Sequence, residues 1–148
     1  MTDVVKLAQR LYRRIKWQEI PESLYTDDLI DMICDAIRAL YVISGRSSSY
    51  SDDKFVTTED HETHEKEVTF EDTLQLDEEE WVLKKGEVLF YSMAQSNVDD
   101  LQSYTTDAMA VTHGDKPFKN IGSILSGCND ELAVIWTRMV RFNQLGAV

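Results

Sequence analysis

Two stretches in the first third of the chain place apolar residues at helical spacing, and this pattern constrains the fold more than any other feature. Apolar residues recur every three or four positions over residues 4–15 and again over residues 29–41. Pro21 lies between the two stretches, where it breaks the first helix, and Gly45 is placed to end the second. The sequence therefore predicts two antiparallel helices that pack through their apolar faces.

Capping residues mark where the helices are expected to begin. Thr2 is placed to cap a first helix that starts at Asp3, and Thr26 caps the second. Asp77 and Glu80 have the three-residue spacing of a capping box, which predicts the start of a third helix. These signals indicate that helices account for most of the chain.

The second half of the chain contains two polar segments that we expect to interrupt helices. Residues 95–100, QSNVDD, are predicted to end the third helix, and residues 126–131, SGCNDE, are predicted to precede the last one. Pro117 is placed to start a short helix between them. The sequence thus predicts several short helices after residue 76.

A β-hairpin is predicted between the second and third helices. Residues 55–58 and 68–70 are rich in β-branched and aromatic residues, which favour strands. The expected register forms four cross-strand pairs, namely Phe55 with Phe70, Thr57 with Val68, Glu59 with Lys66, and His61 with His64 across a Glu62-Thr63 turn. The apolar residues of this arm are predicted to contact another subunit; they are Phe55, Val56, Val68 and Phe70.

The fold class expected from these elements is mostly α. We predict a single domain over residues 1–148, built as a small helical bundle, with a protruding β-hairpin or extended arm at about residues 47–76. A loop of this length in a compact domain is usually functional or disordered. An apolar hairpin face would be a liability as a lone edge, and a neighbouring subunit would cover it.

The negative charge of the chain is concentrated in one middle segment that includes the arm. The chain has a net charge of −12, and residues 47–80 hold thirteen acidic residues against Lys54 and Lys66, whereas residues 1–20 are net basic. A chain this acidic is a poor candidate for wrapping nucleic acid, because each phosphate contact needs a cation. A basic helix and an acidic arm are complementary surfaces, as head-to-tail assembly into a ring requires.

The two cysteines and the apolar runs bear on the compartment. Cys34 and Cys128 lie far apart, each within an apolar helical pattern, which favours two reduced core thiols over a disulfide or a metal pair. The N-terminus lacks the pattern of a signal peptide, and no apolar run approaches the roughly 20 residues that span a membrane. We expect no membrane association.

The three histidines are candidate metal-binding or catalytic residues. His61 and His64 are three residues apart among carboxylates, but the metalloprotease pattern needs a spacing of four on a helix, and an exposed turn offers no enclosure. His113 beside Asp115 would suit a general base, although no nucleophile motif accompanies it. We therefore expect no metal, no cofactor and no catalytic site. A small metal-dependent or His113-based enzyme is the alternative outside the structural class.

The layout of the chain resembles a family of virion proteins. A helical hairpin whose second helix reads YTDDLIDMICDAIRALYVISGR, followed by an extended excursion and further helices, is similar to the head–tail connector proteins of long-tailed bacteriophages, also called adaptor or head-completion proteins. The segments VTHGDKPFKN and IWTRMVRF also look phage-like. Another phage neck or tail-terminator protein is an alternative within the same class, and a helical adaptor that regulates a host protein is a third.

The resemblance implies a structural role rather than catalysis. Members of the family assemble as a ring, usually a dodecamer, between the portal protein and the next neck or tail-completion protein, and DNA passes through without sequence-specific binding. The location implied is the neck of the virion, and the host cytoplasm during assembly. The residues we predict to contact a subunit or the portal are Arg10, Arg13, Arg14, Arg138, Arg141, Phe142, Leu145 and Val148.

Overall fold

The computed structural model describes residues 1–15, 27–46, 54–63, 66–104 and 121–146. Its elements in chain order are β1 (Thr2–Asp3), α1 (Val4–Arg14), α2 (Asp27–Ile43), β2 (Phe55–Glu59), β3 (Lys66–Phe70), α3 (Leu76–Tyr104) and α4 (Ile121–Gly146). The prediction of a mostly helical protein with a β-hairpin between the second and third helices is confirmed. Tyr104 ends α3, and Pro117 lies outside the described residues. The short helix expected after Pro117 is not separate, because its apolar residues Ile121, Ile124 and Leu125 form the start of α4.

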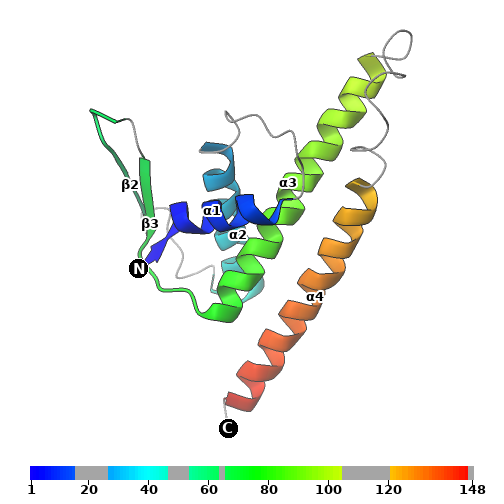
Figure 1. The fold of residues 1–148 in the computed structure, drawn as a ribbon. Coiled ribbons are helices and arrows are strands. Elements are labelled where there is room, and N and C mark those ends of the chain that lie inside the picture. The colour runs from blue at the N-terminus through cyan, green and yellow to red at the C-terminus, as the bar shows by residue number, and fades with distance from the viewer. Residues whose placement is uncertain (16–26, 47–53, 64–65, 105–120, 147–148) are drawn as a thin grey trace.

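The helix α3 is the central element of the fold. It packs against α1, α2 and α4, and α4 runs antiparallel along it (Figure 1). Helix α1 lies across α2 and α3, so the predicted antiparallel pairing of the first two helices is wrong. Gly86 permits a close crossing, because a Cβ atom at this position would lie 2.9 Å from Cδ2 of the buried Leu11. The crossing is a tertiary feature that helical periodicity does not encode.

The structure moves the start of α1 by one residue and confirms the end of α2. Asp3, not Thr2, caps α1, since its carboxylate accepts a hydrogen bond from the Lys6 amide. Gly45 has φ 76°, and the amides of Gly45 and Arg46 donate to Val42 and Tyr41. This pair of hydrogen bonds is the Schellman motif that a glycine stop predicts.

The cap of α3 also differs from the prediction. The Glu78 carboxylate accepts a hydrogen bond from the Gln75 amide at 3.2 Å, which is one half of a capping box. The expected box of Asp77 and Glu80 is therefore shifted two residues toward the N-terminus. Glu80 instead faces α1, where it pairs with Arg14.

The helices α3 and α4 are long and uninterrupted, so the predicted breaks at residues 95–100 and 126–131 are wrong. Asparagine, serine and aspartate cost a helix interior less than about 1 kcal/mol each, and even glycine costs only about 1 kcal/mol. At residues 126–131, Cys128 is buried against α3, so tertiary packing offsets this cost. A polar segment without proline does not end a helix that a neighbour supports.

The hairpin has the predicted register and gains a strand that the sequence did not reveal. Strands β2 and β3 pair antiparallel with Phe55 opposite Phe70, Thr57 opposite Val68, and Glu59 opposite Lys66. The expected His61–His64 pair extends beyond the described residues. The strand β1 pairs with the other side of β3, which gives the order β1-β3-β2. The strand β1 has only two residues, too few to show the alternation of apolar and polar side chains that marks a strand.

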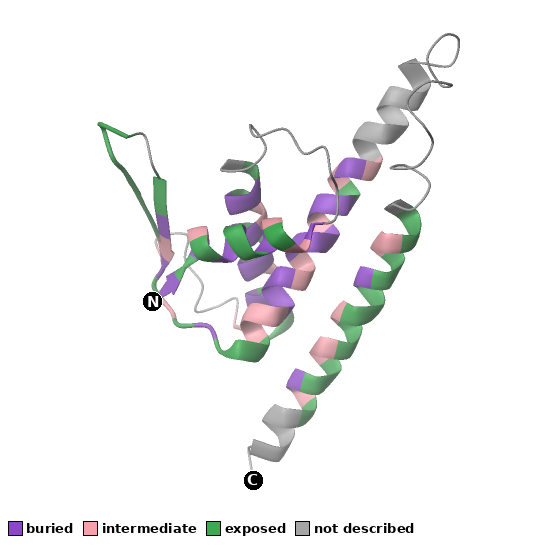
Figure 2. Ribbon diagram, viewed as in Figure 1, coloured by how far each residue is buried: buried purple, intermediate pink, exposed green. Residues whose placement is uncertain are grey.

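The core lies where α1, α2, α3 and β3 meet. Figure 2 shows buried residues concentrated on α2 and the first half of α3, with few on α4. The largest fully buried side chains come from all four of these elements and include Leu11, Ile33, Phe70 and Leu83. Cys34 and Cys128 are both buried free thiols, as predicted.

Candidate functional site

The basic face of α1 is largely paired within the chain. Arg10 Nη1 lies 3.1 Å from Glu79 Oε2, and Arg14 Nη2 lies 2.5 Å from Glu80 Oε1. The Glu80 hydrogen bond raises the pKa of Arg14, and the same bond lowers the pKa of Glu80. Two of the arginines that we expected to face the acidic arm of a neighbouring subunit thus pair with α3 of their own chain. Arg13 is exposed.

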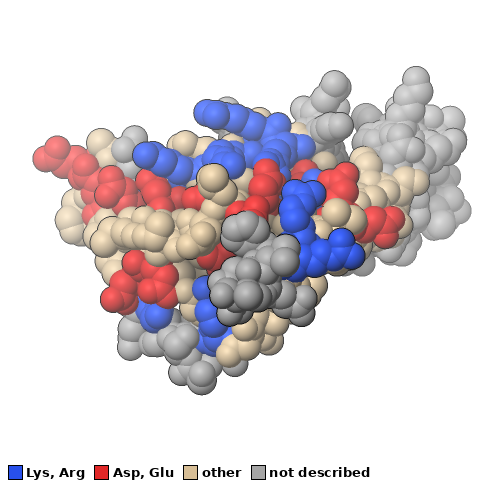
Figure 3. Space-filling view, turned by 90° about the horizontal axis from the view of Figure 1, so that it is seen from below, with Lys and Arg blue, Asp and Glu red and all other residues tan. Residues whose placement is uncertain are grey.

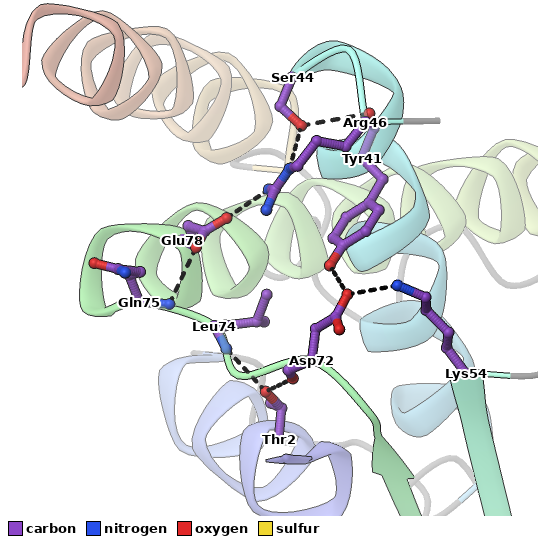
Figure 4. A network of polar contacts seen from close by, with 9 residues as sticks. All are labelled: Thr2, Tyr41, Ser44, Arg46, Lys54, Asp72, Leu74, Gln75 and Glu78. Carbon is purple, nitrogen blue, oxygen red and sulfur yellow. Dashed lines mark hydrogen bonds and ion pairs between the residues drawn. The ribbon is translucent and has the colours of Figure 1, made fainter. Parts of the chain in front are cut away.

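A polar network ties the base of the hairpin to the helices (Figure 4). The Asp72 carboxylate accepts hydrogen bonds from Tyr41 Oη at 2.5 Å and from Lys54 Nζ at 2.8 Å. Both bonds lower the pKa of Asp72, and the bond from Lys54 has the larger effect. Burial and the bond to Asp72 raise the pKa of Tyr41 to about 12. Thr2 Oγ1 donates to the Asp72 carbonyl and accepts from the Leu74 amide, so the N-terminus is bound to the same segment.

The same network extends to the end of α2 through Arg46. Its guanidinium lies 4.3 Å from the centroid of the Tyr41 ring and 2.5 Å from Glu78 Oε2 at the start of α3, while Nε donates to Ser44 Oγ. No sequence pattern signals these contacts, because Tyr41 and Asp72 are 31 residues apart. The network therefore holds the hairpin, α2 and α3 in one arrangement.

The apolar face of the hairpin belongs mainly to the chain's own core. Phe70 is fully buried and Val68 is 5% exposed, and the Phe70 ring contacts Tyr41 and Phe55 at centroid distances of 5.5 and 4.8 Å. This burial corrects the expectation that these two side chains form a subunit contact. Phe55 is half-buried, and Val56, on the opposite face, is 52% exposed. Of the four predicted contact residues of the arm, Val56 is the most exposed.

A charged hollow of about 480 Å³ lies between α1, α3 and α4. Within it, Lys84 Nζ lies 2.6 Å from Glu131 Oε2 and 2.8 Å from Oε2 of the buried Glu87. The second contact is an ion pair between residues three positions apart on α3. Burial alone would lower the pKa of Lys84, but the contacts with Glu131 and Glu87 outweigh it and raise the pKa. Lys84 thus links α3 to α4, and Arg138 lines the same hollow.

The helix α4 has two different sides. One side carries Asp130, Glu131, Val134, Arg138 and Arg141, which are all exposed. The other side is defined by five uncharged residues three or four positions apart, which we call the uncharged face of α4. They are Leu125, Asn129, Leu132, Trp136 and Val140, of which all but the exposed Asn129 are half-buried.

The predicted C-terminal contact residues are placed only in part. The helix α4 continues through Gly146, so Phe142 and Leu145 belong to it. The side chains of both residues, and all of Val148, lie outside the described residues. Their proposed contact with a partner stays a prediction.

The histidines are mostly outside the described part of the chain. His61 is exposed in the turn after β2, where the Asp60 carboxylate accepts a hydrogen bond from the Glu62 amide at 3.0 Å. His64 and His113 lie in segments that the structure does not describe. Among the described residues, no group of three or more His, Cys, Asp or Glu side chains is arranged to hold a metal ion.

None of the described helices is both long and apolar enough to cross a membrane. Comparison of the chain with protein-family models, with curated proteins and with solved structures returned no match.

Proposed function

We propose that the chain is a structural subunit of a long-tailed bacteriophage, a head–tail connector that forms a ring between the portal and the tail around the path of the DNA. The observation that carries the proposal is the uncharged face of α4. This face runs along the helix and is only partly covered by α3. A helix from a neighbouring copy fits such a surface.

The low burial of the α4 side chains supports an interaction of this helix with a neighbouring chain. Helical propensity alone gives little stability in water, so a helix of 26 residues depends on tertiary packing. Among its described side chains, only Cys128 and Met139 are buried. A second helix against Leu132 and Trp136 would remove more apolar surface from water, at about 25 cal/mol per Å².

The absence of charge on this face favours a copy of the same chain as its neighbour. Chains with a net charge of −12 repel one another, and an interface that buried like charges would add to that cost. The uncharged face allows two chains to approach without burying a carboxylate. The acidic hairpin would also disfavour tight binding to DNA phosphates, which suits a conduit.

We propose that the predicted contact residues on α1 and at the end of α4 bind the portal protein. Arg10 and Arg14 already pair with α3, so Arg13, Arg138 and Arg141 are the arginines more available to a partner. The end of α4, with Phe142, Leu145 and the following Val148, is the proposed apolar anchor. Repeated around a ring, a small gain per subunit would give firm attachment through avidity.

Native mass spectrometry and negative-stain microscopy test this proposal, with the protein alone and mixed with portal protein from the same genome. We expect a discrete ring in at least one of the two conditions. Trp136→Lys should abolish it, whereas Val134→Lys, on the charged side of the same helix, should not. A protein that stays monomeric in both conditions, or equal behaviour of the two variants, would contradict the proposal.

A further inference from the structure

The hydrogen-bond pattern of the hairpin determines which backbone groups of β2 point away from β3. The Glu71 amide donates to the Lys54 carbonyl at 2.9 Å, and Lys54 and Glu71 extend the β2–β3 register by one pair. In an antiparallel ladder, hydrogen-bonded pairs alternate with pairs that are not bonded. Val56 and Thr58 therefore bond to β3, while the amides and carbonyls of Thr57 and Glu59 point to the outer edge.

This outer edge carries no proline, no lysine and no bulge, three features that commonly protect edge strands. The strand order places β2 at the edge of the sheet formed by the described strands, and residues 56–59 are exposed. The segment FVTTE contains no proline and no lysine, and five consecutive pairs with β3 form without a bulge. Natural edges that must stay unpaired usually carry such devices. The backbone of this edge therefore suits the addition of a strand.

The charge around the edge indicates what kind of strand it would accept. Glu59, Asp60, Glu62 and Glu67 are exposed on the hairpin, and Figure 3 shows acidic side chains reaching the end of the molecule where the hairpin lies. Two copies of this edge would bring these carboxylates together, and nucleic acid would be repelled in the same way. A lysine- or arginine-rich polypeptide is complementary.

We propose that the outer edge of β2 binds an extended, basic segment of a partner protein, which adds a fourth strand to the sheet. Main-chain hydrogen bonds to Thr57 and Glu59 would supply the pairing, and the acidic side chains would select basic partners. The Asp72 network and the buried Phe70 hold the base of the hairpin in place. Binding therefore loses less free energy to the ordering of the hairpin. This proposal does not depend on ring assembly.

Residue-resolved amide exchange by NMR tests the proposal within a single strand. In the free protein, the Thr57 and Glu59 amides should exchange at least about tenfold faster than those of Val56 and Thr58, because only the latter bond to β3. The probe is an eight-residue peptide in which lysine alternates with valine. At saturation it should slow exchange at Thr57 and Glu59 to the level of their neighbours.

Two control peptides separate backbone pairing from charge. A peptide with glutamate in place of lysine should not bind, and a lysine peptide N-methylated on its pairing edge should lose the protection of Thr57 and Glu59. Amides of Thr57 and Glu59 that are already protected in the free protein would overturn the proposal, because the edge would then be occupied. Equal binding of the lysine and glutamate peptides would overturn it as well.

Matched variants locate the binding to the edge. Thr57→Pro removes an amide that points outward, so the protein should stay folded and lose peptide binding, whereas Thr58→Pro removes a ladder bond and should destabilise the hairpin. The double variant Glu59→Gln with Glu62→Gln leaves the edge amides intact and should weaken lysine-peptide binding about threefold to tenfold. Unchanged affinity in the double variant would refute the charge selection, whether or not Thr57→Pro folds.

Discussion

Strand β3 and helix α4 show how little the length of an element says about its contribution to the fold. The five residues of β3 include two buried side chains, Val68 and Phe70. The 26 residues of α4 contribute only Cys128 and Met139 among their described side chains. A short strand is thus enclosed by its own chain, and a long helix is not.

The difference arises from the number of neighbours each element has. Strand β3 lies between β1 and β2 and contacts α1, and Phe70 packs against Tyr41 of α2. Helix α4 packs mainly on α3, and most of its described side chains stay exposed or half-buried. We expect stability to be concentrated at the hairpin base and to be lowest along α4.

The largest expected effect is at Phe70. Phe70→Ser should reduce the free energy of unfolding by about 3–5 kcal/mol, because it leaves a cavity in the core and buries a hydroxyl. Urea denaturation followed by circular dichroism measures this change. Val56→Ser, on the exposed face of the same hairpin, should stay within about 0.5 kcal/mol. A loss below about 1 kcal/mol for Phe70→Ser would mean that the hairpin base is not part of the core.

A leucine in α3 and one in α4 provide the next comparison. Leu83 is fully buried, and Leu83→Ala should cost about 2–5 kcal/mol in urea denaturation. Leu132 is half-buried, and Leu132→Ala should cost about half as much, because less apolar surface returns to water. The measurement belongs at low protein concentration, where assembly does not contribute. Equal losses would show that α4 is as firmly packed as α3.

The two buried cysteines report the local opening of α2 and α4. Burial raises the pKa of Cys34 to about 11 and also raises that of Cys128, so both thiols should react slowly in the folded protein. If α4 opens more readily than α2, a thiol reagent should modify Cys128 at least about tenfold faster than Cys34. A tenfold ratio corresponds to a difference of about 1.4 kcal/mol between the free energies of opening of the two helices. Mass spectrometry of digested protein assigns the sites. Faster reaction at Cys34 would reverse the comparison.

The smallest expected effect is the pH dependence of the hairpin network. The pKa of Asp72 is lowered in the folded protein, so its contribution is present above the unfolded pKa of about 4 and is lost as the pH falls through the folded value. Asp72→Asn should flatten the loss of stability below about pH 5. We expect a change of about 0.5 kcal/mol or less, because solvent screens this pair.

The opposite sign applies to Tyr41 in alkali. Its pKa is raised to about 12, so its contribution is present below the unfolded value of about 10 and is lost between about pH 10 and pH 12. A Tyr41→Phe variant should lose this alkaline dependence in chemical denaturation. Glu62→Gln, at the exposed turn, serves as the control for both pH ranges and should leave both profiles unchanged.

Sequence patterns predicted the elements whose signals are local. The hairpin register followed from matching Phe55 with Phe70 and Thr57 with Val68, because a register shift of one residue would reverse every side chain. The stop at Gly45 followed from the need for positive φ. Both depend on residues that are close along the chain or that alternate with a fixed period.

The same patterns failed where contacts between distant segments decide the outcome. The breaks predicted in α3 and α4 depended on propensities of under about 1 kcal/mol per residue, which helix packing outweighs. The acidic arm looked like a surface for another subunit. In the structure, Arg10 and Arg14 of α1 pair instead with Glu79 and Glu80, which follow the arm in α3.

The sequence by itself determined that this protein is mostly helical, that a hairpin interrupts the helices, and how the two strands of that hairpin align. Periodicity and capping carry this information because they act over a few residues. Only the tertiary structure decided which apolar faces are covered. The crossing of α1 over Gly86 and the burial of Phe70 beneath Tyr41 bring together residues tens of positions apart. Burial is a property of the packed chain, so α4 proves to be the open face and the hairpin base the closed one.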